Sequence, residues 1–137
     1  MLGQALTDVW LAKGDLKQAG PEAERFLELT LATAERTWQA LAWEASARVA
    51  MAGGDHHRAS TCIDNALSAM EGFEVPLAAW RVHASAAELE TRRGNQRAAG
   101  RHRCARRRDG SRLGQILWWI TNVSAQHSLR RRRCARS

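Results

Sequence analysis

The chain has 137 residues, of which 45% are hydrophobic, so it is long enough to form one domain with a packed core. It contains no tyrosine and only two prolines, which favours helices over a sheet. The net charge of +7 is unevenly distributed, because the last 37 residues hold eleven arginines and one acid (+10) and the first 100 residues carry −3.

Two predicted helices at the start of the chain are joined at a glycine. On one face of residues 2–13, at helical spacing, lie Leu2, Leu6, Val9 and Trp10. Gly14 can end this helix in the left-handed conformation, and Asp15 can cap a second helix that we expect to run to about residue 33. These two helices form the first predicted pair.

Two further helix pairs follow the same plan. Residues 36–52 and 55–70 form the second pair, and its second helix has the cleanest amphipathic spacing in the chain. The third pair consists of residues 76–93 and a helix that begins near residue 96. The apolar pattern of this sixth helix fails after about residue 100, where the sequence becomes strongly basic.

The turns between the paired helices recur every 40 residues, as Gly14-Asp15, Gly54-Asp55 and Gly94-Asn95. Alanine follows each of these glycines after five residues. The residues that define the repeat are Gly14, Ala19, Ala47, Gly54, Ala59, Ala66, Ala87, Gly94 and Ala99. A period of roughly 20–50 residues is typical of stacked helical repeats, which more often bind proteins than catalyse reactions.

The second unit, with Ala47, Gly54, Ala59 and Ala66, resembles a tetratricopeptide repeat (TPR), whereas Phe26 of the first unit stands where that family has a small residue. The period exceeds the roughly 34 residues usual for the family. Residues 2–100 resemble the longer-helix arrays at the C-terminal ends of bacterial regulators linked to cyclases, ATPases or kinases. This resemblance implies an all-α, right-handed solenoid of about three antiparallel helix pairs.

The resemblance also implies a non-catalytic protein-interaction module, in which the first helices of the pairs form a concave groove for a partner peptide or helix. The odd number and wide spacing of the three cysteines fit a reducing cytoplasm. The candidate groove residues are polar and aromatic positions outside the core stripe: Gln39, Trp43, Glu44, Arg81, His83 and Glu88. Trp10, Trp38 and Trp80 are expected to face the core. Because Met1 stands almost inside the first helix, without a capping repeat, we expect the chain to be a piece of a larger signalling protein.

Residues 101–137 are predicted to form an irregular basic tail with one of two origins. A functional tail would attract phosphates of a nucleic acid or an anionic surface without sequence specificity. Its candidate residues are Arg106, Arg107, Arg108, Arg130, Arg131, Arg132 and Arg133.

A shifted reading frame is the second possible origin of this tail. Tryptophan has a single codon, so Trp118-Trp119 followed by Ile120 fixes part of the DNA sequence. With suitable synonymous codons, the segment from Arg103 onward re-reads one base earlier as an amphipathic continuation of the sixth helix. This hypothesis predicts a poorly packed tail without an evolved function, and the DNA sequence in all three frames tests it.

No catalytic or metal-binding constellation is predicted. The sequence contains no glycine-rich phosphate loop and no metalloprotease or hydrolase motif. His56 and His57 are adjacent and point in different directions on a helix, so they do not form a ligand pair. Cys104 and Cys134 have the wrong spacing for a zinc finger, and Cys62 is expected to be a small core residue. No apolar run is long enough for a membrane helix.

Overall fold

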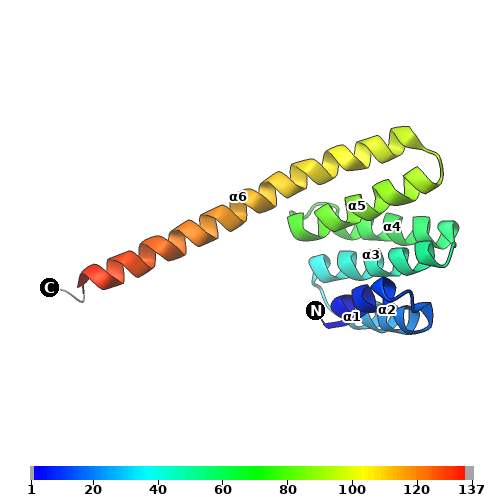
Figure 1. The fold of residues 1–137 in the computed structure, drawn as a ribbon, viewed down its shortest axis with the longest axis horizontal. Coiled ribbons are helices and arrows are strands. Elements are labelled where there is room, and N and C mark those ends of the chain that lie inside the picture. Colours follow the sequence, from blue (N-terminus) through cyan, green and yellow to red (C-terminus); the bar gives the residue numbers. More distant parts are fainter. Residues whose placement is uncertain (1, 135–137) are drawn as a thin grey trace.

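The computed structural model describes residues 2–134, with side chains described for residues 2–118, and this part of the chain is entirely helical and turn. Its helices, in order, are α1 (Leu2–Ala12), α2 (Leu16–Leu31), α3 (Arg36–Ala52), α4 (His56–Met70), α5 (Pro76–Arg92) and α6 (Gln96–Cys134). Successive helices run antiparallel and stack beside one another (Figure 1). The all-α prediction is therefore confirmed, and α1 to α5 end within two residues of the predicted positions.

The turns after α1, α3 and α5 are built alike. Each contains a glycine with positive φ, namely Gly14 (+72°), Gly54 (+80°) and Gly94 (+77°). The backbone N–H of the next residue donates to the carbonyl five residues earlier, over 2.8–2.9 Å, which completes a Schellman motif. The side chain of that residue then accepts a bond from a backbone N–H three residues later and caps the following helix. The 40-residue period is thus also a repeat of turn geometry.

Small residues lie where the paired helices cross. Ala19, Ala59 and Ala99, each five residues after a turn glycine, are completely buried. Ala47, Ala66 and Ala87 are also buried, in α3, α4 and α5. Because a methyl group keeps neighbouring backbones close, these alanines permit tight antiparallel packing.

The first helices of the three pairs form one layer. In the described part of the chain, α3 contacts both α1 and α5, whereas α2 and α4 contact only their neighbours in chain order. The core lies within and beneath this layer, around the fully buried Leu41, Val82 and Leu89. Cys62 is a buried part of the core, as predicted.

The apolar face predicted for α1 is wrong for two of its four residues, since Leu6 and Trp10 are half-buried but Leu2 and Val9 are exposed. Leu2 and Val9 are 74% and 47% exposed, and Thr7 is the buried residue of this helix. The hydroxyl of Thr7 donates to the carbonyl of Gly3 over 2.8 Å, so its burial leaves no unpaired polar group. Gly3 faces Phe26, where an added Cβ would lie only 2.8 Å from the Cβ of Phe26. The close approach of α1 to α2 is thus seen at Gly3, which has no side chain between it and Phe26.

The irregular tail predicted from residue 101 is also wrong, because α6 continues as a helix to Cys134 and extends beyond the other helices (Figure 1). At the start of α6, the buried Ala98 and Ala99 face α5. Further along α6, Gly110 lies close to Trp80 of α5. These small residues let α6 pack on α5, and the arginines between them favour a helix. The boundary proposed at residue 100 falls inside α6, and the shifted-frame hypothesis stays a prediction.

We expect Gly54→Ala to lower the free energy of unfolding by about 1 kcal/mol, because the left-handed conformation costs roughly 1–2 kcal/mol for a residue with a Cβ. Gly53→Ala is the matched control, since Gly53 has a φ of −80° and its nearest contacts to an added Cβ are at 3.6 Å. Urea unfolding followed by circular dichroism measures both variants. Equal losses in the two variants would show that the turn geometry is not the cause.

Candidate functional site

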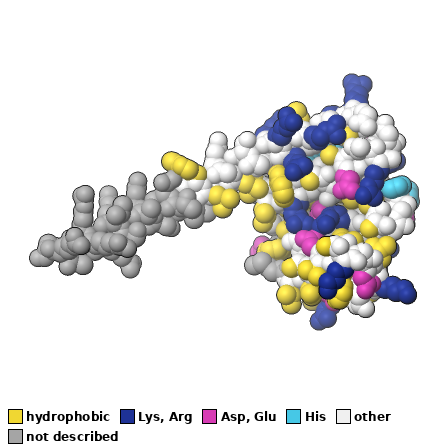
Figure 2. Space-filling model, viewed as in Figure 1, with side chains coloured by type: hydrophobic (Ala, Val, Ile, Leu, Met, Phe, Trp, Pro, Cys, Tyr) yellow, Lys and Arg dark blue, Asp and Glu magenta, His cyan; other side chains and the backbone are white. Residues whose placement is uncertain are grey.

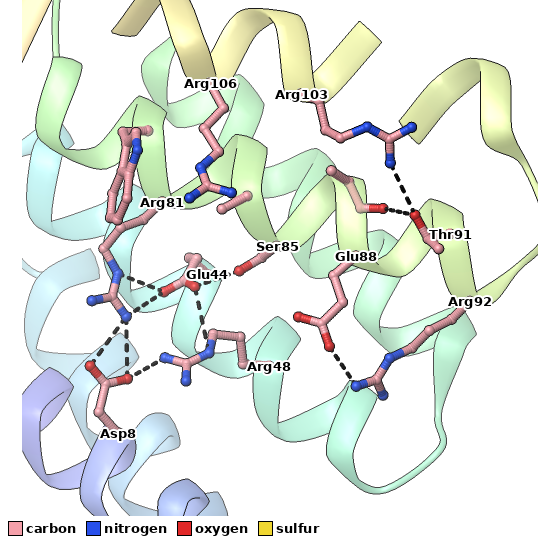
Figure 3. A pocket seen from close by; sticks show the side chains of 13 residues that line it. Asp8, Glu44, Arg48, Arg81, Ser85, Glu88, Thr91, Arg92, Arg103 and Arg106 are labelled. Atoms are coloured by element: carbon pink, nitrogen blue, oxygen red, sulfur yellow. Dashed lines mark hydrogen bonds and ion pairs between the residues drawn. The ribbon is translucent and has the colours of Figure 1, made fainter. Parts of the chain in front are cut away.

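A groove of about 670 Å³ opens on the layer of α1, α3 and α5, and α6 forms one of its walls (Figure 3). α1 contributes Asp8, α3 contributes Glu44 and Arg48, and α5 provides most of the floor. Arg103 and Arg106 reach into it from α6. Five arginines and three carboxylates line this groove, so its charged side chains give it an excess of positive charge.

Glu44 is the buried centre of the groove floor, with only 1% of its surface exposed. The hydroxyl of Ser85 donates to its carboxylate over 2.6 Å, and the Nε atoms of Arg81 and Arg48 lie 3.5 and 3.8 Å from its oxygens. Burial raises the pKa of Glu44 above its ordinary value, although Arg81, Ser85 and Arg48 act in the opposite direction. The carboxylate is therefore held in place by α5 at a cost in desolvation.

Asp8 joins α1 to the same network. Arg81 donates to both of its carboxylate oxygens over 3.2 Å, and Arg48 forms an ion pair with it. Beside this network, Glu88 pairs with Arg92, which also donates to the carbonyl of Met51 over 3.2 Å. The charges of the floor therefore neutralise one another within the protein.

The α6 wall has no such compensation. The guanidinium carbon of Arg106 lies 5.2 Å from the ring centroid of Trp80, at cation–π distance. Arg103 donates to the hydroxyl of Thr91 over 3.5 Å. Among the residues with described side chains, no carboxylate lies within 4.0 Å of a guanidinium nitrogen of Arg103 or Arg106. The groove thus combines a neutral floor with a positively charged wall.

Three of the predicted groove residues, Glu44, Arg81 and Glu88, line the groove. Trp43 does not, because it packs against both clusters of the core, and Trp80 is the tryptophan that lines the groove. This exchange reverses the predicted positions of the two tryptophans.

The other two predicted groove residues lie elsewhere. The side-chain amide of Gln39 donates to the carbonyl of Thr33 over 2.6 Å and ties α3 to the preceding turn. His83 faces α6, where its Nδ1 lies 3.0 Å from the Nδ1 of His102. Neither residue therefore contributes to the groove described here.

Sequence reasoning missed Asp8, Arg48 and Ser85. A signal was present for the first two, because Asp8, Arg48 and Glu88 stand at successive 40-residue intervals and thus at equivalent positions of the repeat. Arg103 was assigned to a tail, so its place in the wall was not foreseen. The side chains of Arg130 to Arg133 lie outside those that the structure describes, while Arg106 lines the groove.

The two histidines between α5 and α6 form a hydrogen-bonded pair, which requires at least one neutral ring to accept the bond. Burial lowers the pKa of His83, as does His102, whereas Asp109 raises it. Burial also lowers the pKa of His102, with Arg101 acting in the same direction and Glu90 against it. The described residues contain no group of three or more potential ligands that could hold a metal ion.

Comparison of the chain with protein-family models, with curated proteins and with solved structures returns no match. Within residues 2–134, none of the helices has the length and apolar character needed to cross a membrane. The interpretation of the groove therefore rests on its own geometry and charge.

We expect Glu44→Gln to gain stability relative to the wild type as the pH rises from about 4.5 towards neutrality. The pKa of Glu44 is raised on folding, so its favourable contribution is complete below the ordinary value of 4.5 and is lost as the carboxyl ionises. Urea midpoints measured across this pH range test the trend. Glu24→Gln, at an exposed position, is the control. If it gained stability relative to the wild type in the same way as the pH rises, Glu44 would not be the cause.

The wild type should lose stability as the pH falls below about 6.5, because folding lowers the pKa of both His83 and His102. As the pH falls, these histidines are protonated in the unfolded chain at a higher pH than in the folded chain, which favours the unfolded state. The double variant His83→Asn/His102→Asn should show a weaker dependence. Thermal midpoints between about pH 5.5 and 7.5 measure this difference. His57→Asn, at an exposed position of α4, should keep the wild-type slope.

Proposed function

We propose that this chain is a non-catalytic protein-interaction module that holds a segment of a partner protein in the groove of α1, α3 and α5. Its helix pairs would form a right-handed, TPR-like solenoid. The three equivalent Gly–Asx turns and the mutual contacts of α1, α3 and α5 support this architecture. In the cytoplasm, such a module would serve as a scaffold or sensory segment of a larger bacterial regulator.

The observation that carries this proposal is that one groove draws residues from α1, α3, α5 and α6. Pockets for small molecules are mostly apolar with a few polar groups, whereas Trp80 and two alanines are the apolar part of this lining. The remaining lining consists of charged side chains and hydroxyls. A polypeptide segment, which offers charged side chains and backbone amides along its length, matches this surface better than a small apolar ligand.

Binding of nucleic acid through the arginines of α6 is the second candidate. Arg107 and Arg108 are exposed on this helix, which favours contact with phosphates. Such binding would depend steeply on salt and would not require the groove floor. Substitutions confined to the floor therefore separate the two candidates.

The test begins with a peptide selected on the wild-type chain from a phage-displayed random library and then synthesised. We expect Glu88→Ala/Arg92→Ala to weaken its binding about tenfold or more, because the groove floor loses a charged pair. The net charge is unchanged. The exposed i,i+4 pair contributes about 0.3–0.5 kcal/mol to stability and the lost bond from Arg92 to the carbonyl of Met51 about 1 kcal/mol, so circular dichroism first checks that the variant is folded. Fluorescence anisotropy measures the affinity.

Glu24→Ala/Arg58→Ala is the matched control, since it removes another exposed ion pair, between α2 and α4 and away from the groove. It should change the affinity less than about twofold. If both double variants weaken binding equally, or neither does, the selected peptide does not occupy the groove.

A further inference from the structure

Where the groove reaches α6, its lining merges with that of a second cavity of about 370 Å³, formed by Trp80, Gly110 and three arginines. Arg103, Arg106 and Arg107 come from successive turns of one face of α6, and the first two also line the groove. Figure 2 shows Lys and Arg side chains gathered where α6 crosses the helical body. The lining of the groove thus ends in a local concentration of positive charge.

These three arginines are not neutralised by the described part of the protein. No described carboxylate lies within 4.0 Å of their guanidinium nitrogens, whereas Arg48 and Arg81 of the floor each have two and Arg92 has one. The acid of α6, Asp109, lines a different cavity together with Glu74 and Arg112. The excess charge of the groove is therefore confined to its α6 end.

The surroundings also fix the position of this charge. The ring of Trp80 supports the guanidinium of Arg106 at 5.2 Å, and the hydroxyl of Thr91 accepts a bond from Arg103. Gly110 of α6 lies beside the edge of the indole, where an added Cβ would be 3.5 Å from Cδ1 of Trp80, an ordinary contact distance. Two of the three guanidiniums thus have contacts that orient them while leaving their charge available.

We propose that this end of the groove binds a phosphate group carried by the partner segment, an inference that rests on the proposed function. A carboxylate carries one charge, whereas a phosphorylated side chain carries about −1.5 to −2 and presents three strong acceptor oxygens. Arginine forks bind such oxygens in pairs. Three uncompensated guanidiniums around one cavity therefore suit a phosphate better than a single carboxylate, and the chain would bind its partner in a phosphorylation-dependent manner.

The test uses three fluorescein-labelled nonapeptide libraries that differ only at the central residue: phosphothreonine, glutamate or threonine. We expect the full chain to bind the phosphothreonine library about tenfold more tightly than the glutamate library in anisotropy titrations at physiological salt. Arg103→Gln/Arg106→Gln should abolish this preference. Arg101→Gln/Arg108→Gln, which removes the same charge from exposed positions that line none of these cavities, should retain it.

Several outcomes would overturn the inference. Equal binding of the phosphothreonine and glutamate libraries would show that the site does not distinguish phosphate. Non-specific attraction by α6 would be shown if the two double variants lost equal affinity for the phosphothreonine library. It would also be shown if an oligothymidylate bound more tightly than the peptides and equally to both variants. Displacement of the peptides by an equal concentration of inorganic phosphate would show a site for free phosphate.

The outcomes also separate this inference from the proposed function. If the peptide selected on the wild type depends on Glu88 and Arg92 while the phosphothreonine preference is absent, the groove binds a partner but not its phosphate. If neither dependence is found, the proposed function fails as well.

Discussion

The groove depends on a carboxylate buried in the middle of the helix layer. Glu44 lies in α3, between α1 and α5, and it is 1% exposed. An ionised carboxylate in this position is unfavourable unless it is paired and hydrogen-bonded, and Ser85 and Arg81 of α5 provide both contacts. Loss of Arg81 would remove a counter-charge from Glu44, and loss of Ser85 would remove a hydrogen bond from it. The lateral alignment of α3 and α5 is therefore coupled to the chemistry of the groove floor.

The same constraint extends to α1 through Asp8. Leu2 and Val9 of α1 are exposed and contribute little to its packing, whereas Leu6, Trp10 and Leu11 are half-buried. The contacts of Asp8 with Arg48 and Arg81 instead connect α1 to both other helices of the layer. These side chains are 25–33% exposed, so their ion pairs are weak sources of net stability, but the pairs disfavour shifted arrangements in which one partner loses the other. We infer that this network specifies the position of α1 more than it stabilises the fold.

The fold was largely predictable because its signals are local. Gly54 and Asp55 act on a few neighbouring residues, so their type and order are sufficient to predict the end of α3 and the start of α4. The face of α1 was not predictable in this way, because the close contact between Gly3 and Phe26 depends on where α2 lies. The path of α6 was missed because Ala99 and Gly110 are separated by many arginines, which obscure the small-residue face.

The site was less predictable than the fold, because charge pairing is a property of the assembled layer. The sequence predicts Glu44 and Arg81 as polar residues outside the core stripe, but the burial of Glu44 and its pairing with Arg81 depend on how α1, α3 and α5 are placed. The spacing predicts Trp80 on the core stripe and Trp43 outside it, but the surroundings of each ring depend on the neighbouring helices. Trp43 lies between the two core clusters, whereas Trp80 meets α6.

The two halves of the groove differ in how they depend on the reading frame after residue 102. The floor, from Asp8 to Arg92, precedes that segment, so its network and its neutral charge are the same in either frame. The positively charged wall exists in the present frame alone, because Arg103 and Arg106 both lie in the segment that the shifted frame would replace. Peptide binding that requires the floor alone is therefore compatible with both frames. A phosphate preference carried by Arg103 and Arg106 is a property of the present frame, and its physical basis is the contrast between a compensated floor and an uncompensated wall.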